Sequence, residues 1–281
     1  MVGCLSLSFS RDPVMHHAET DIPPWPSRPA HLDEIDDSPS DVFCRAVDYP
    51  AGRLVPPHRH RKHQLIHAVR GLMVVTAEQG RWVVPSTRAV WMPAGWEHSV
   101  RCIGEVHMRS LYLRPEAVAH LPARAAATVR IDPLLRELIA SAVQVLQPYD
   151  VDSRDGHLMR LLLDELRTLP VLPLHLPEPV DPRLRRIARH FETHPDDNAT
   201  LQAWGEALGV DARTVQRLCR AELGMSFARW RQQARLLRAL EQLASGDKVI
   251  DVAAAVGYEN PSAFTRMFRR HFGLTPGEFF G

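Results

Sequence analysis

The stretch GEALGVDARTVQRLCRAELGM, residues 205–225, is repeated in outline by AAAVGYENPSAFTRMFRRHFGL, residues 253–274. In each copy a small residue stands four positions before a glycine, and an apolar residue follows that glycine after six or seven positions. The small residue lets two helices cross closely, the glycine supplies the positive φ of a tight turn, and the apolar residue anchors the second helix. Each copy therefore predicts a helix-turn-helix, and the pair predicts a bipartite reader of DNA.

The second helix of each copy has a polar face opposite its apolar residues. In the first copy this face carries Arg213, Gln216 and Arg217. In the second copy, which Asn260 and Pro261 open as N-cap and first residue, it carries Ser262, Thr265 and Arg266. Arginine forks onto guanine and glutamine onto adenine in the major groove. A solvated helix face has the same composition, so the helix-turn-helix spacing is what favours base reading.

The segment between the two copies carries Trp230, Ala234, Leu237 and Leu240 at helical spacing. We expect one long helix over residues 227–243, which would fix the two readers relative to each other. The whole chain beyond the proline-rich segment at 171–182 is predicted to be helical. We therefore expect a DNA-binding domain at residues 183–281, with helix-turn-helix units at 201–222 and 249–271.

The N-terminal half has a different pattern. Between residues 41 and 113, short apolar runs and period-two alternations are separated by glycines and prolines, which predicts an antiparallel sandwich or barrel. From Asp132 the apolar period becomes helical. Asp132 and Pro133 open one predicted helix that extends to residue 146, and a second covers residues 156–169.

The expected organisation is α+β with two domains. Its parts are a flexible, proline-rich tail at 1–40, a cupin-like β-barrel sensor domain at 41–115, a helical dimerisation segment at 116–170, a linker at 171–182 and the DNA-binding domain at 183–281.

Composition adds few constraints. The 281 residues carry a formal net charge of +1, which does not by itself indicate nucleic acid. The marked preference for arginine over lysine suits forked contacts to bases and phosphates, but GC-rich coding would produce the same bias. The four cysteines form no CxxC pair, and no apolar run approaches the about 18 residues of a membrane span. We expect a reduced, cytoplasmic protein with no membrane partner.

Residues 183–281 resemble the DNA-binding domain of the AraC/XylS family of bacterial transcription regulators. The resemblance is carried by LQAWG at 201–205, GVDARTVQRLCR at 209–220, GMSF at 224–227, QARLLRAL at 233–240, VAAAVGY at 252–258, SAFTRMFRR at 262–270 and FGLTP at 272–276. It implies that the two polar faces described above approach bases in successive major grooves. Gly205 stands where the family usually has alanine, and Asp211 where it usually has serine.

A second resemblance covers the N-terminal half. The spacing from Gly52 to Gly71 resembles the first cupin motif, and PAGWEH at 93–98 resembles the second. It implies a small antiparallel barrel in which four side chains converge on a divalent metal ion: His58, His60, Gln64 and His98. Two departures weaken that expectation, because neutral Gln64 replaces the usual glutamate and Cys102 stands where asparagine is common.

Three roles remain open for these histidines. They hold a first-row metal ion such as Zn, Ni or Fe, they line a ligand pocket without metal, or they belong to an exposed histidine-rich strand that also includes His63 and His67. Taken together, the resemblances imply a sequence-specific transcription regulator that is not an enzyme. Its implied partners are double-stranded operator DNA, a small-molecule effector in the barrel, a second copy of the chain and, for an activator, RNA polymerase. The alternative is a cupin-type metalloenzyme that carries a DNA-binding domain.

Overall fold

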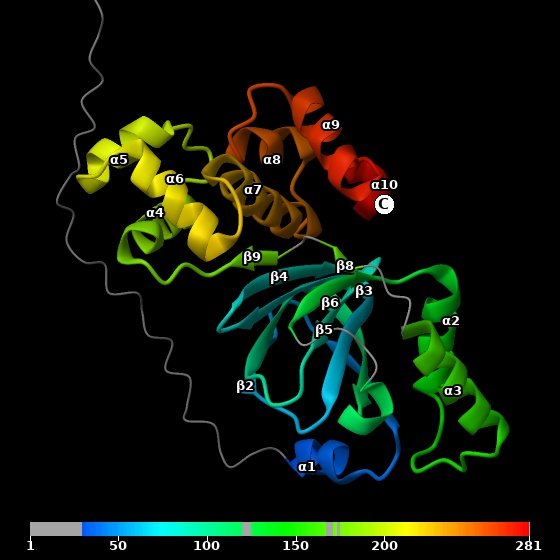
Figure 1. The fold of residues 1–281 in the computed structure, drawn as a ribbon. Helices are drawn as coiled ribbons and strands as arrows, with labels where there is room; N and C mark the ends of the chain where they lie inside the picture. Colours follow the sequence, from blue (N-terminus) through cyan, green and yellow to red (C-terminus); the bar gives the residue numbers. More distant parts are fainter. Residues whose placement is uncertain (1–29, 120–124, 167–170, 173–174, 281) are drawn as a thin grey trace, which may run out of the picture.

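The structure, a computed structural model, describes residues 30–119, 125–166, 171–172 and 175–280. It has two parts (Figure 1), an N-terminal half built on an antiparallel sheet and a C-terminal half built only of helices. We call them the sheet half and the helical half. The expected α+β organisation is therefore confirmed. Within the described residues no helix is both long enough and apolar enough to cross a lipid bilayer.

The described residues of the sheet half contain nine strands in one sheet. They are β1 (Val42–Tyr49), β2 (Leu54–His58), β3 (His63–Ala77), β4 (Gly80–Pro85), β5 (Arg88–Met92), β6 (His98–Leu113), β7 (Ala127–Arg130), β8 (Val171–Leu172) and β9 (His175–Pro177). The long strands β3 and β6 pair along nearly their whole length, from His63 opposite Leu113 to Ala77 opposite His98. One end of this pair continues into β1 and into β5, β7 and β8, and the other end continues into β2 and into β4 and β9. The sheet thus rolls around β3 and β6, and the described pairings do not close it into a ring.

A glycine lies where the long pair of strands bends. The register between β3 and β6 shifts around Gly71, whose φ is 87°. A Cβ atom at this position would lie 2.2 Å from the carbonyl oxygen of Glu105 on β6. Glycine is therefore required here both by the positive φ and by the close approach of the neighbouring strand.

Strand alternation divides the apolar side chains of the sheet between two faces. Met73, Val75 and Trp82 belong to the cluster inside the rolled sheet. Their neighbours Leu72 and Val74 belong to a different cluster, on the outer face. The sheet therefore has a core of its own and also an apolar outer surface that another element must cover.

Two helices cover the outer face at one end of the sheet: α2 (Pro133–Ala142) and α3 (Arg154–Leu166). The carboxylate of Asp132 accepts a hydrogen bond from the backbone N–H of Leu135 at 2.9 Å, and Pro133 follows it. The predicted helix start is confirmed, because an N-cap carboxylate and an N1 proline both satisfy the unpaired first turn. Helix α2 ends at Ala142, earlier than the predicted residue 146, and the predicted end of α3 at residue 169 lies outside the described residues.

Two segments differ from the expectation of irregular chain. Part of the predicted flexible tail forms helix α1 (Ala30–Asp37), because Leu32 and Ile35 pack against Phe43 and Tyr112. Residues 1–29 of that tail lie outside the described residues. The predicted linker contributes β8 and β9 to the sheet, since short edge strands tolerate the prolines that a central strand excludes.

The helical half contains both predicted helix-turn-helix units. Its helices are α4 (Pro182–Thr193), α5 (Leu201–Leu208), α6 (Ala212–Leu223), α7 (Phe227–Ala244), α8 (Val249–Ala255), α9 (Pro261–Phe272) and α10 (Pro276–Phe280). The first unit is α5 and α6, the second is α8 and α9, and α7 is the predicted long helix between them. Gly209 ends α5 with a φ of 68°, as the turn requires.

The first unit is tighter than the sequence alone suggested. A Cβ atom on Gly205 would lie 2.8 Å from the backbone oxygen of Val210 and 3.0 Å from the backbone nitrogen of Ala212. The turn therefore packs directly on the backbone of α5. In the second unit the matching residue is Ala253, which is fully buried. The turn of the second unit is one residue longer than that of the first.

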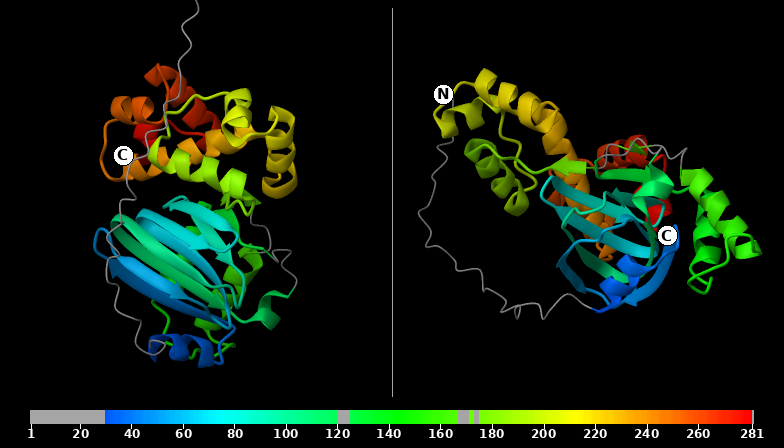
Figure 2. Two further views of the ribbon diagram at one scale, coloured as in Figure 1. Left: turned by 90° about the vertical axis from the view of Figure 1, so that its left-hand side faces the viewer. Right: turned by 60° about the horizontal axis from the view of Figure 1, so that its bottom comes forward.

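The two halves share one apolar cluster. Leu72 and Val74 of the sheet pack in the same cluster as Leu237 and Leu240 of α7 and Phe264 of α9. The first unit has a separate cluster around Trp204 and Trp230, to which β1–β7 contribute none of their described residues. Figure 2 shows the helical half seated along the sheet. The second unit is consequently fastened to the sheet through α7, while the first is held less directly.

Candidate DNA-reading helices and histidine cluster

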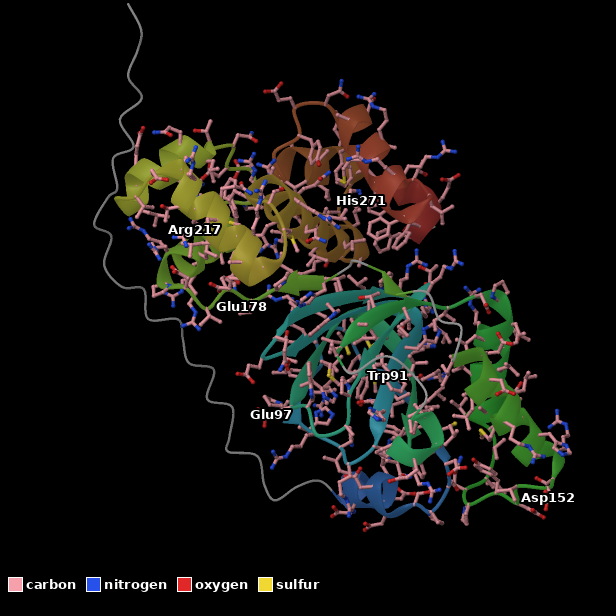
Figure 3. The ribbon with its side chains drawn as sticks, viewed as in Figure 1. Trp91, Glu97, Asp152, Glu178, Arg217 and His271 are labelled. Carbon is pink, nitrogen blue, oxygen red and sulfur yellow. The ribbon has the colours of Figure 1, made fainter. Side chains whose placement is uncertain are left out.

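Helix α6 presents the first predicted reader face to solvent. The carboxylate of Asp211 accepts a hydrogen bond from the N–H of Thr214 at 2.7 Å and fixes where the helix begins. Val215 and Cys219 are fully buried against the rest of the unit. Because these residues fix the rotation of the helix, Arg213 and Arg217 are exposed on the other side. Figure 3 labels Arg217 on α6 in the helical half.

The other predicted residue of this face is less accessible. Gln216 is half-buried, and its amide nitrogen is shielded without a hydrogen-bond partner in the described part of the chain. The amide of Gln216 could pair with N7 and N6 of adenine. The side chain must first turn outward.

Helix α9 presents the second predicted reader face. Asn260 caps it through a 2.7 Å hydrogen bond from the N–H of Ser262 to its side-chain oxygen. Phe264 and Phe268 are fully buried, so Ser262 and Arg266 are exposed and Thr265 is half-buried. The last turn adds Arg269 and Arg270, which are exposed as well. The positive charge of this face lies in its second half, from Arg266 to Arg270.

The predicted histidine site is assembled inside the rolled sheet. His58 lies at the end of β2, His60 follows it in the turn before β3, and His98 begins β6. Each of the three can direct one ligand atom so that all of these atoms lie within 4.8 Å of one another. His60 and His98 are buried, with 3% and 2% of their surfaces exposed. The hypothesis of an exposed histidine-rich strand is therefore wrong for His60 and His98, and His58 is half-buried.

Backbone carbonyl groups orient two of the rings. Nδ1 of His58 donates to the carbonyl of Pro56 at 2.8 Å, and Nδ1 of His98 donates to the carbonyl of Trp96 at 3.1 Å. A carbonyl oxygen only accepts, so each neutral ring carries its lone pair on Nε2. Burial, with a smaller contribution from the charge of His58, lowers the pKa of His98 to about 4. His98 is therefore neutral near pH 7, which is the form that binds metal ions or accepts hydrogen bonds.

Gln64 lies on the inner face of the same sheet but is engaged in other hydrogen bonds. Its amide nitrogen donates to Ser110 and to Tyr112, each at 3.1 Å. Tyr112 in turn lies edge-on to His60, with ring centroids 4.8 Å apart. The side-chain oxygen of Gln64 is buried without a partner among the described residues. Gln64 thus supports the wall of the site, and its oxygen is the atom left for a ligand.

Ser110 and Tyr112 were missed by sequence reasoning. Both belong to β6 and lie two positions apart, so they point to the same face of the sheet. The period of two along a strand could therefore have identified them. Counting every second residue from His98 reaches both positions, because Val100, Cys102, Val106 and Met108 between them all pack inside the rolled sheet.

A divalent metal ion fits the residues present. Three imidazoles offer nitrogen donors, which suit first-row ions, and the carbonyl-bound Nδ1 atoms supply the outer support typical of such sites. Nε2 of His98 is buried with no partner among the described residues, as expected of an atom awaiting a ligand. No carboxylate belongs to this group in the described residues, so any ion would be held without a compensating negative charge.

Comparison with known proteins matches both halves of the chain. Residues 204–281 match a helix-turn-helix domain, and residues 39–187 match an AraC-like ligand-binding domain. The HTH-type transcriptional regulator NimR of Escherichia coli is 36% identical over 224 residues, which cover 80% of this chain and 81% of the relative. The regulator RipA of Corynebacterium glutamicum is 36% identical over 120 residues, which cover 43% of this chain and 34% of the relative.

Among solved structures, an apo form of ToxT from Vibrio cholerae aligns over 86% of this chain and 98% of its own, with 11% identity and a TM-score of 0.36. The sequence similarity to NimR is much stronger than the structural similarity to ToxT.

Proposed function

Because this chain belongs to the AraC-type family of DNA-binding transcription regulators with a ligand-binding domain, we propose that α6 and α9 read operator bases under the control of an effector in the rolled sheet. The observation that carries this proposal is the pair of capped helices with exposed arginines, held on one long helix. Two such helices enter successive major grooves when they lie on the same side of the duplex.

We assign base contacts to Arg213, Gln216 and Arg217 of α6 and to Ser262, Thr265 and Arg266 of α9. The arginines supply forked donors that match guanine, and the shorter side chains permit close approach of α9. The remaining exposed arginines of α9, Arg269 and Arg270, suit phosphate contacts, which position the protein without selecting sequence.

We assign effector binding to the histidine cluster and Gln64. The buried lone pairs of His98 Nε2 and Gln64 Oε1 favour a ligand that donates hydrogen bonds, or a metal ion between ligand and protein. A resident first-row ion would be held by His58, His60 and His98 and would supply a Lewis-acidic anchor for an oxygen or nitrogen atom of the effector. The side chains on the inner face of the rolled sheet select the effector by enclosing it.

The relatives are transcription regulators, and we propose that this chain likewise has no catalytic reaction of its own. The metalloenzyme alternative requires an acid or base beside the histidines. The ring of Tyr112 lies edge-on to His60, its hydroxyl accepts a hydrogen bond from the amide of Gln64, and burial raises the pKa of that hydroxyl well above its usual value. Neither group exchanges protons readily near neutral pH. We also propose a homodimer that works in the cytoplasm and contacts RNA polymerase if it activates.

The test combines metal analysis with DNA binding. Metal content of the purified protein is measured first, and then operator affinity of wild type and of a His58→Ala/His60→Ala double variant is compared across candidate effectors. We expect an effector-dependent change of affinity in wild type that the double variant loses, while basal DNA binding persists. Stoichiometric metal with turnover of a small substrate would instead establish the enzyme. If operator binding by the double variant responds to the effector as that of wild type does, the rolled sheet serves only as a scaffold.

A further inference from the structure

The two helix-turn-helix units pack on different parts of one helix. Phe227 and Trp230 of α7 belong to the apolar cluster of the first unit, whereas Leu236 and Leu240 belong to the cluster of the second. Figure 1 shows α7 lying between the two units. Within the described residues the two clusters have no buried member in common, so apolar packing ties each unit to α7 rather than to the other. A direct contact between the units is made by residues 194–200, which we call the α4–α5 loop.

The α4–α5 loop is held on α7 by one half-buried arginine. Nε of Arg235 donates to the carbonyl of Pro195 at 2.8 Å. Its Nη2 donates to the carbonyls of Asp196 at 3.1 Å and Asp197 at 2.8 Å, and to the side-chain oxygen of Asn198 at 3.0 Å. Acceptors from four consecutive residues thus converge on one planar group. Because hydrogen bonds are directional and the guanidinium is rigid, this contact fixes the orientation of the loop as well as its distance from α7.

The α4–α5 loop is also ordered by contacts of its own. One carboxylate oxygen of Asp197 accepts a hydrogen bond from the N–H of Ala199 at 2.6 Å, and the other lies 2.7 Å from Nε2 of His190 in the last turn of α4. Thr200 then caps α5 by accepting from the N–H of Ala203 at 3.1 Å. A movement of this loop relative to α7 therefore carries α5 with it, and α6 follows because the turn between them packs on the backbone of α5.

The second unit meets the α4–α5 loop at the same arginine. Gly257 lies in the turn between α8 and α9, with a φ of 79°. A Cβ atom on Gly257 would lie 2.8 Å from the carbonyl oxygen of Asp196 and 2.8 Å from Nη2 of Arg235. The turn of the second unit therefore rests directly on the loop of the first unit and on the side chain that holds this loop. Arg235 is the place where α7 and both units meet.

A contact at this place restricts how the first unit can move. Its chain continues into α7 through residues 224–226, at the beginning of that helix. Arg235 lies about 12 Å further along α7, at about 1.5 Å per residue. A unit attached only at the start of α7 could pivot there, and a second attachment at Arg235 opposes the pivot. Adding one base pair of B-DNA displaces a reader by about 3.4 Å and turns it by about 35°, so a modest pivot changes the spacing that two readers can reach.

We propose that Arg235 is a positioning residue for DNA recognition, which fixes α6 relative to α9 and so sets the number of base pairs between the two sequence blocks that these helices read. The inference rests on the proposed function, since it requires both helices to read bases. Arg235 acts on the DNA only through the α4–α5 loop and the turn at Gly257.

The test measures spacing preference with the full-length protein. The duplexes carry the sequence that wild type selects from random DNA, with the spacer between its two blocks kept, shortened by one base pair or lengthened by one. Wild type should bind the unchanged spacer about tenfold more tightly than either altered one, because one reader loses its register. In Arg235→Lys this preference should fall to about twofold, since the single nitrogen of lysine cannot reach all four acceptors.

Arg231→Lys is the matched control, one turn earlier on the same helix. Arg231 makes one hydrogen bond to the α4–α5 loop, from Nη1 to the carbonyl of Ala199 at 2.8 Å, and lysine can make one as well. The preference of this variant should stay within about twofold of wild type. A merely structural role of Arg235 would lower the affinity for all three duplexes by the same factor and leave their ratio unchanged, because that ratio does not depend on the folded fraction.

Asn198→Ala removes one of the four acceptors and should reduce the preference to about fivefold. It takes the place of Arg235→Lys if the lysine variant fails to fold. An unchanged preference in the folded variant, or a wild type that binds all three spacers equally, would overturn the positioning role. A wild type that selects no pair of blocks would instead contradict the proposed function, and this inference with it.

Discussion

Individual residues decide whether the first helix-turn-helix can form. Intrinsic propensity disfavours Gly205 in the middle of α5, yet the backbone of the turn lies where its side chain would be. The histidines follow the same logic, since His58 and His98 are oriented by carbonyl groups of their own turns rather than by distant partners. At Gly205 the close contact with the turn therefore outweighs the low helix propensity of glycine.

Replacement of Gly205 by alanine should therefore destabilise the chain. Helix propensity alone would predict a gain of about 1 kcal/mol, but a Cβ atom 2.8 Å from the backbone of Val210 forces the turn to move. The comparison is Gly277→Ala in α10, where a Cβ atom meets nothing within 4 Å. Urea unfolding of both variants measures the difference. A Gly205→Ala variant as stable as Gly277→Ala would refute the close contact.

His67 should make the sheet half sensitive to acid. Burial lowers its pKa to about 4, while in the unfolded chain it keeps an ordinary value of about 6.5. As the pH falls below 6.5 the unfolded state binds the proton first, so stability declines by up to about 3 kcal/mol by pH 4. In a His67→Gln variant the free energy of unfolding should fall less steeply over this range. The exposed His157→Gln serves as control, and equal slopes for the two variants would exclude His67 as the cause.

Among the secondary-structure elements, α2 and α3 carry apolar residues that the fold leaves uncovered. Leu134 of α2 is 49% exposed and Leu161 of α3 is 44% exposed, although the opposite faces of both helices are buried on the sheet. Exposed leucines on neighbouring helices suit contact with a second copy of the chain, where their burial contributes roughly 1.5–3 kcal/mol each.

We therefore expect a Leu161→Asp variant to shift the full-length protein from dimer to monomer. Sedimentation at tens of micromolar protein checks this, and Val180→Asp, an exposed apolar position outside these helices, is the matched control. A wild-type protein that is already monomeric at that concentration would remove the basis for dimerisation through α2 and α3.

An element could be predicted from the sequence when the residues that determine it lie within a few positions of it. Caps such as Asp132 and Asp211 and the turn glycine Gly209 act within a few residues, so the starts of α2 and α6 and the end of α5 followed from the sequence. Helix α1 and strand β9 depend on packing against distant strands, so their prolines and charges pointed to irregular chain. The partners of Gln64 lie in alternation with His98 along β6, so period two along that strand carried a signal for them.

The molecule as a whole joins one candidate site to one pair of candidate readers. Strand β6 carries His98 of the histidine cluster, and Arg101 of the same strand forms an ion pair with Glu241 of α7 at 3.3 Å. Strand β6 also contributes Ile103 to the cluster that holds α7 and the second reader unit. A shift of this strand on effector binding would therefore act on α7 directly, and through it on the spacing of α6 and α9.

The central claim is that α6 reads bases, and selection of bound sites from random DNA tests it most directly. Wild type should select two short sequence blocks, and Arg217→Ala should lose preference at one or two base pairs of one block, with about 1–3 kcal/mol lower affinity for the wild-type site. Arg185→Ala, an exposed arginine of α4 outside both readers, should weaken all sequences about equally or not at all. An Arg217→Ala variant with unchanged affinity and an unchanged selected pattern would contradict the account.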